Sequence, residues 1–179
     1  MFAAISQTLV LCGPGFEASN ETLIQELKRR NLHQHVILLG FRSDIPRVMA
    51  ALDIFVLSSL YGEALPLVVI EAMACGVPVV ASDIGDIQRA IGRWGKAVQT
   101  RSPQQFAEAV LHYIRLSEEE RRSVAINARD RVATMFPLSS AVDQHEALYR
   151  HVLGLAPKSD MMEESVSSGD PIRRAGDLA

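Results

Sequence analysis

The chain has 179 residues and a mass of 19.6 kDa, with 48% hydrophobic and 22% charged residues. This is long enough for one domain with a full core, and too apolar for a globally disordered chain. The formal net charge of −3 excludes strong, unspecific nucleic-acid binding through bulk charge.

The first half of the sequence alternates short apolar runs with helical patterns. An apolar run bounded by turn residues predicts a strand covered on both faces, and apolar residues on one face predict a helix. In chain order we predict a strand at Thr8–Cys12, a helix at Glu21–Asn31, a strand at His35–Leu39, a helix from Asp44 to about Leu52, and a strand at Ile54–Leu57.

The second half continues this alternation and ends in helices. We predict a helix from Pro66 to about Cys75, a strand at Pro78–Ala81, a short helix over about Ile87–Ile91, a short strand at Lys96–Gln99, and helices over about Pro103–Leu116, Ser117–Met135 and Ser139–Leu153. Residues 1–155 are predicted to form one domain. Residues 156–179 have almost no apolar periodicity, and we expect a disordered tail.

Strands that alternate with helices indicate an α/β fold, a parallel sheet flanked by helices. Ligands bind such sheets at the carboxyl ends of the strands. Function is therefore expected in the loops that follow Cys12, Leu39, Leu57 and Ala81.

Two carboxylates stand out beside the third of these loops. Glu63 precedes the helix predicted from Pro66, and Glu71 lies inside that helix among apolar residues. Burying a lone charge is very costly, so Glu71 either has a partner or a wet cleft, or marks the one solvent-facing stripe of the helix. Periodicity alone leaves both alternatives open.

The start of the same helix lacks an ordinary cap. No Ser, Thr, Asp or Asn directly precedes Pro66, so the first backbone N–H groups are left for a ligand, for water, or for Ser59 reaching from the loop. A helix N-terminus favours phosphate through its dipole and its free N–H groups.

Other motifs are weaker or absent. Gly13-Pro14-Gly15 is not a full dinucleotide-binding fingerprint, and a tight turn explains it better. The five histidines form no short metal-ligand pair, and the arginines between Glu118 and Arg131 are expected on a solvated helix face. Cys12 and Cys75 lie in apolar runs, so we expect reduced, buried core thiols, as suits the cytoplasm. No apolar run reaches the about 18–20 residues of a membrane span.

The run from Leu57 to Asp83 is specific enough to suggest a family. It resembles the E-x(7)-E segment of the family-four, GT-B-fold glycosyltransferases, retaining enzymes that use nucleotide-activated sugars. Upstream, Leu9–Gly15, Val36–Phe41 and Ala51–Leu57 agree with the same family, and downstream Gly95–Val98 and Pro103–Val110 also fit. The resemblance covers roughly Leu9 to Leu153, and implies the Rossmann-like, C-terminal, nucleotide-sugar-binding domain.

The resemblance implies roles for particular residues. Glu63 matches the glutamate that contacts the donor sugar near the reacting carbon, and is the catalytic candidate; Glu71 matches the one that binds the ribose hydroxyls. The donor diphosphate and sugar would be held by backbone N–H groups at the helix start, which match Ala64, Leu65, Pro66, Leu67 and Val68. The nucleobase would lie against Gly40, Phe41 and Arg42. No metal and no cofactor is implied.

The sequence departs from the family pattern in two ways. The loop that often reads Asp-x-Gly-Gly in the family here reads Asp83-Ile84-Gly85-Asp86. The acceptor-binding N-terminal domain, the first and central strand of the sheet, and an Arg and a Lys that neutralise the leaving diphosphate are not matched. We therefore expect direct pairing of Thr8–Cys12 with Ile54–Leu57, a strand donated by a partner chain, or a gap between them, and we favour the gap. We expect no sugar transfer by these residues alone.

The expected function is that of the donor-binding half of a retaining glycosyltransferase. Its partners would be the nucleotide-sugar donor and the N-terminal acceptor domain, with no nucleic acid; peripheral association of the full enzyme with a membrane stays open. The alternative is a non-catalytic nucleotide-sugar-binding or interaction module of the same fold.

Overall fold

The structure is a computed structural model that describes residues 7–155. The elements are β1 (Leu9–Cys12), α1 (Glu21–Arg29), β2 (Val36–Gly40), α2 (Ile45–Ala50), β3 (Phe55–Leu57), α3 (Leu67–Ala74), β4 (Val79–Ser82), α4 (Ile87–Ile91), the 3-10 turn η1 (Gly92–Trp94), β5 (Gly95–Val98), α5 (Pro103–Ile114), α6 (Glu118–Met135) and α7 (Leu138–Val152). Every predicted strand and helix is present. The last strand begins at Gly95 rather than Lys96. The tail expected at residues 156–179 lies outside the described residues.

The strands form two parallel sheets. Strand β1 pairs with β2, and a second sheet has the order β3-β4-β5, so the predicted parallel α/β class is confirmed. No hydrogen bonds join β1 to β3, and no strand of the described residues 7–155 lies between them. Direct pairing of these two strands is therefore wrong, and the favoured gap agrees with the structure.

The main core lies on the two faces of the β3-β4-β5 sheet. Side chains alternate across β4. Val79 and Ala81 join a cluster with α3, α4 and α6, while Val80 on the other face clusters with Val98 of β5 and Tyr113 of α5. This alternation explains why every residue of β4 is buried. The central strand is therefore a rigid base for the loops at its carboxyl end.

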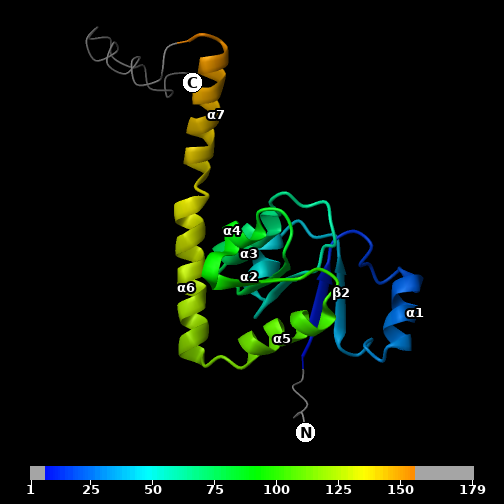
Figure 1. Cartoon of the computed structure of the whole chain (residues 1–179). Coiled ribbons are helices and arrows are strands. Elements are labelled where there is room, and N and C mark those ends of the chain that lie inside the picture. Colours follow the sequence, from blue (N-terminus) through cyan, green and yellow to red (C-terminus); the bar gives the residue numbers. More distant parts are fainter. Residues whose placement is uncertain (1–6, 156–179) are drawn as a thin grey trace, which may run out of the picture.

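Helix α6 fixes the helices of the sheet through its arginines, and Figure 1 shows it running along one side of the domain. Arg129 donates to the carbonyls of Ala74 and Cys75 over 3.1 and 3.2 Å, at the end of α3. Arg131 donates to the Ala90 carbonyl over 2.7 Å, at the end of α4. A cation at a helix C-terminus satisfies free carbonyls and complements the dipole. Arg129 is exposed, as expected for a solvated face, whereas Arg131 is half-buried, and both arginines also bind the end of a neighbouring helix.

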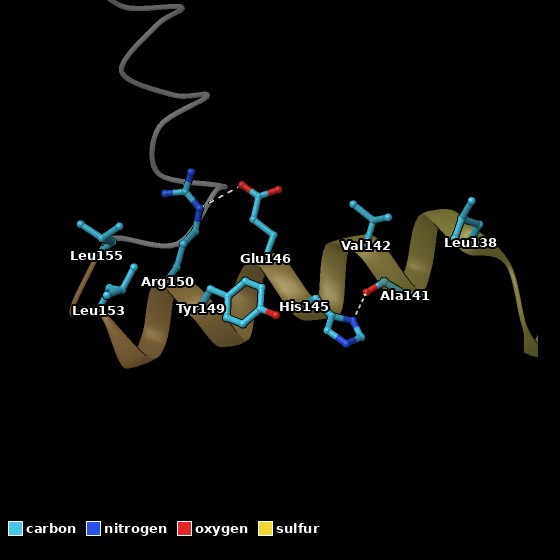
Figure 2. A pocket seen from close by; sticks show the side chains of 9 residues that line it. All are labelled: Leu138, Ala141, Val142, His145, Glu146, Tyr149, Arg150, Leu153 and Leu155. Carbon is cyan, nitrogen blue, oxygen red and sulfur yellow. Dashed lines mark hydrogen bonds and ion pairs between the residues drawn. The ribbon is translucent and has the colours of Figure 1, made fainter. Parts of the chain in front are cut away.

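Helix α7 continues beyond α6 and extends away from the sheets (Figure 1). A hollow runs along one flank of it, and Figure 2 shows that the lining side chains come only from α7 and the two residues Leu153 and Leu155. The hollow contains the Arg150–Glu146 ion pair, with 3.0 Å between Nε and Oε1. It shares no residue with the predicted donor site.

The two cysteines differ from expectation in one respect. Both are free thiols, but Cys12 and Cys75 are each half-buried rather than buried. Cys12 lies at the end of a strand in the two-stranded sheet, and Cys75 is the residue at the C-terminus of α3. No residue of β1 is fully buried in this sheet of only two strands, which explains the partial exposure of Cys12.

Candidate functional site at the carboxyl ends of the strands

The segment from β3 to α3 presents a row of backbone donors. Pro66 is the residue before α3 and makes no side-chain cap bond. Within residues 7–155, the N–H groups of Ala64, Leu65, Leu67 and Val68 form no hydrogen bond. Pro66 has no N–H, so it can shape this segment but cannot donate. The prediction of an uncapped helix start is confirmed, and Ser59 does not cap it.

Ser59 instead contacts the first glutamate. Its Oγ donates to Oε1 of Glu63 over 3.2 Å, and both side chains are half-buried. The hydroxyl therefore holds one carboxylate oxygen of Glu63 and leaves the other without a hydrogen bond inside the described chain.

Glu71 lies on the exposed face of α3. Val69, Ala72 and Met73 of the same helix are fully buried. Glu71 shares the remaining face with Leu67 and Val68, and its carboxylate forms no hydrogen bond or ion pair within the described part of the chain. This placement agrees with the solvent-facing stripe, and the ribose contact that the resemblance implies stays a prediction.

The loop after β4 packs on the segment that carries Glu63. The Asp86 N–H donates to the Ala64 carbonyl over 2.7 Å. A Cβ on Gly85 would lie only 2.5 Å from the carbonyl oxygen of Glu63 and closer still to that of Ala64, and the φ of Gly85 is +55°. Position 85 therefore requires glycine. Asp86 has φ −91°, which any residue adopts, so the departure from Asp-x-Gly-Gly fits this backbone.

The candidate nucleobase contacts follow β2 in the other sheet. Gly40 is buried at the end of β2, and its carbonyl accepts from the Gly13 N–H over 2.8 Å. Phe41 is 75% exposed, which leaves its ring face open to a ligand. Arg42 forms two hydrogen bonds to Asp44, of 2.8 and 2.7 Å, and this guanidinium holds the pKa of the Asp44 carboxyl below its usual value.

The predicted site residues thus fall into two groups. Glu63, Glu71 and the five residues from Ala64 to Val68 belong to one continuous segment, and Gly40–Arg42 belong to the two-stranded sheet. No hydrogen bond or ion pair joins these groups within residues 7–155. Sequence reasoning missed two supporting residues, Ser59 as a partner of Glu63 and Gly85 as a close backbone contact. The glycine in the loop after β4 was the available signal for the second.

Residues 2–115 match the family described as "Glycosyl transferases group 1". The chain belongs to the group 1 glycosyl transferases. The fold is of the GT-B type that their solved structures share. The predicted family is therefore confirmed.

Relatives in the group 1 glycosyl transferases are longer than this chain. It is 30% identical over 151 residues to N-acetyl-alpha-D-glucosaminyl L-malate synthase of Bacillus anthracis, covering 83% of this chain and 39% of the relative. It is 28% identical, with a TM-score of 0.71, to Anabaena Alr3699/HepE in complex with UDP, covering 83% and 41% of the two chains. The chain thus spans about two fifths of the length of these relatives.

A solved fragment indicates which part of the longer proteins is involved. The C-terminal domain of a group 1 family protein, LpcC from Francisella tularensis, is 31% identical with a TM-score of 0.56, covering 65% of this chain and 61% of that one.

In this group 1 glycosyl transferase chain, none of the helices within residues 7–155 has the length and hydropathy of a membrane span. The same residues contain no cluster of three or more His, Cys, Asp or Glu that could hold a metal ion.

Proposed function

We propose that this domain binds the nucleoside diphosphate sugar donor of a retaining glycosyltransferase. The observation that carries the proposal is a row of four N–H groups, from Ala64 to Val68, that lie between Glu63 and Glu71 and form no hydrogen bond within residues 7–155. Free N–H groups at a helix start attract phosphate, through hydrogen bonds and through the helix dipole. The chain belongs to the group 1 glycosyl transferases, and the Anabaena protein was solved with UDP and with UDP-glucose.

The two glutamates would bind the two ends of the donor. Glu63 stands before the free N–H groups and would hold the sugar hydroxyls near the reacting carbon. Glu71 lies one turn into α3 and would accept hydrogen bonds from the ribose hydroxyls. Carboxylates accept strong, charge-assisted hydrogen bonds from such hydroxyls. The exposure of Glu71 and the absence of an internal partner in the described chain support this role.

The nucleobase would lie on the loop after β2. Phe41 offers an exposed ring for stacking, and two hydrogen bonds to Asp44 fix the orientation of the planar Arg42 guanidinium. The buried Gly40 sets where this loop leaves the sheet. Gly40, Phe41 and Arg42 together would form a platform rather than a pocket.

Sugar transfer would be driven mainly by electrostatic stabilisation. Negative charge builds up on the leaving diphosphate, and aligned N–H dipoles stabilise that charge. The sugar carbon becomes oxocarbenium-like, and Glu63 would orient the sugar and stabilise this positive charge. We propose that no metal and no cofactor takes part, and that an N-terminal domain of the full protein binds the acceptor.

The setting proposed for the enzyme is the cytoplasm, where nucleotide sugars serve as donors. Its two half-buried cysteines are free thiols, which agrees with a reducing compartment. Peripheral contact of the full enzyme with a membrane remains compatible with this setting.

Calorimetric titration with a panel of nucleoside diphosphates and their sugars tests the proposal. We expect saturable binding of at least one nucleoside diphosphate, and tighter binding of its sugar conjugate. The panel should include UDP, GDP, ADP, UDP-glucose and UDP-N-acetylglucosamine. No saturable binding of any member at millimolar concentration would contradict the proposed function.

A further inference from the structure

The side chain of Glu63 is held in place before any donor arrives. The Ser59 hydroxyl donates to its Oε1 over 3.2 Å, from four residues earlier in the same loop. The adjacent Ser58 is exposed and forms no hydrogen bond within the described residues. Of this serine pair, only Ser59 therefore restrains the carboxylate.

The backbone of the same residue is held from a second loop. Gly85 approaches the carbonyls of Glu63 and Ala64 so closely that a Cβ has no room, and the Asp86 N–H bonds the Ala64 carbonyl. This second loop is itself anchored, because the Asp83 N–H donates to the Val98 carbonyl over 2.8 Å, at the end of β5. The backbone at Glu63 is thus connected, through this second loop, to the β3-β4-β5 sheet.

We propose that Ser59 is a positioning residue for the donor sugar, acting through Glu63. This inference rests on the proposed function, in which Glu63 contacts the sugar. A free glutamate side chain loses rotamer freedom when it binds, and a hydrogen bond formed in advance removes part of that loss. Ser59 should therefore strengthen binding of the sugar conjugate while leaving binding of the bare diphosphate unchanged.

The test compares UDP-glucose with UDP on the full 179-residue chain by calorimetric titration. We expect Ser59→Ala to weaken UDP-glucose binding by about two- to tenfold, the range of one net hydrogen bond, with UDP affinity unchanged. Ser59→Thr keeps the hydroxyl and should restore most of the loss. Ser58→Ala is the matched control and should change neither affinity.

A double-mutant cycle shows whether Ser59 acts through the carboxylate. In a Glu63→Ala background, Ser59→Ala should cause no further loss of UDP-glucose affinity. Thermal unfolding of each variant shows whether the fold is kept. The affinity for UDP is a second control, because a damaged loop would lower it as well.

The outcomes separate this inference from the proposed function. If the chain binds both ligands and Ser59→Ala leaves the ratio of their affinities unchanged, the positioning role is wrong and the donor site stands. If Ser59→Ala is equally harmful with Glu63 removed, the role through Glu63 is wrong. If the unaltered chain binds neither these ligands nor any other nucleoside diphosphate, both proposals are wrong.

Discussion

Replacing Gly85 by alanine should destabilise the domain through two separate effects. The φ of Gly85 is +55°, and a non-glycine residue in this region costs about 1–2 kcal/mol. The new Cβ would also lie 2.5 Å from the Glu63 carbonyl oxygen, so the loop has to move away. That movement breaks the 2.7 Å hydrogen bond from Asp86 to Ala64, which contributes about 0.5–1.5 kcal/mol.

The two effects of Gly85→Ala together predict a loss of about 2–3 kcal/mol in the free energy of unfolding, measured by urea denaturation. In a domain of this size the loss corresponds to a fall of about 5–10 °C in Tm. Gly62→Ala is the matched control, because Gly62 has φ +89° with nothing within 4 Å of its Cβ position. It should show the conformational effect alone, about 1 kcal/mol. Equal losses in the two variants would refute the close approach of the two loops.

Three further predictions concern the helices. Glu71→Ala should weaken nucleoside diphosphate binding by about 1.5–3 kcal/mol and leave the unfolding free energy within about 0.5 kcal/mol, since the carboxylate is exposed. Calorimetry and urea denaturation check this against Glu108→Ala, which removes an exposed glutamate of α5 and should change neither quantity. Equal nucleotide affinity of wild type and Glu71→Ala would sink the ribose role. Arg129→Ala should lower the unfolding free energy by about 1–2 kcal/mol, because the carbonyls at the end of α3 lose their donor; Arg122→Ala, exposed and without a hydrogen bond in the described chain, should not. Hydrogen bonds from Ser117 lower the folded pKa of Glu120, so its stabilisation is present above the unfolded pKa and is lost as the pH falls through the folded one. The stability difference between wild type and Glu120→Ala should therefore shrink in acid, and a constant difference would contradict this.

The elements could be predicted because each carries its own local signals. Strand β4 is a short run that directly follows Pro78, and α3 directly follows Pro66 and ends two residues before Gly76, so periodicity and turn chemistry placed both elements within a residue or two. The opening between β1 and β3 was also predictable, because the family resemblance assigned a strand order in which the intervening strand has no match.

Contacts between distant segments could not be predicted in this way. Arg129 and Arg131 look like solvent-facing residues by periodicity. Yet Arg129 binds the carbonyl of Ala74, 55 residues away at the end of α3, and Arg131 binds that of Ala90, 41 residues away at the end of α4. Local patterns carry no information about which helix end lies opposite. The half-burial of Cys75 has the same origin, since it depends on what packs at the end of α3.

The candidate site was predicted in part. The uncapped helix start could be read from the missing cap residue before Pro66, and the structure adds that four neighbouring N–H groups lack hydrogen bonds in the described chain. The partner of Glu63 could not be read, because the Ser59 hydroxyl could either accept from the free N–H groups at the start of α3 or donate to Glu63, and only the loop geometry decides between these roles.

The most direct test of the donor site is a titration of the ¹⁵N-labelled chain with UDP-glucose, followed by amide chemical shifts. The account predicts the largest shifts at the amides of Leu67 and Val68, with further shifts at Phe41 and Arg42. Helix α7 and its hollow should be unaffected. Unchanged amides at Leu67 and Val68, with the largest shifts in α7, would contradict the donor site.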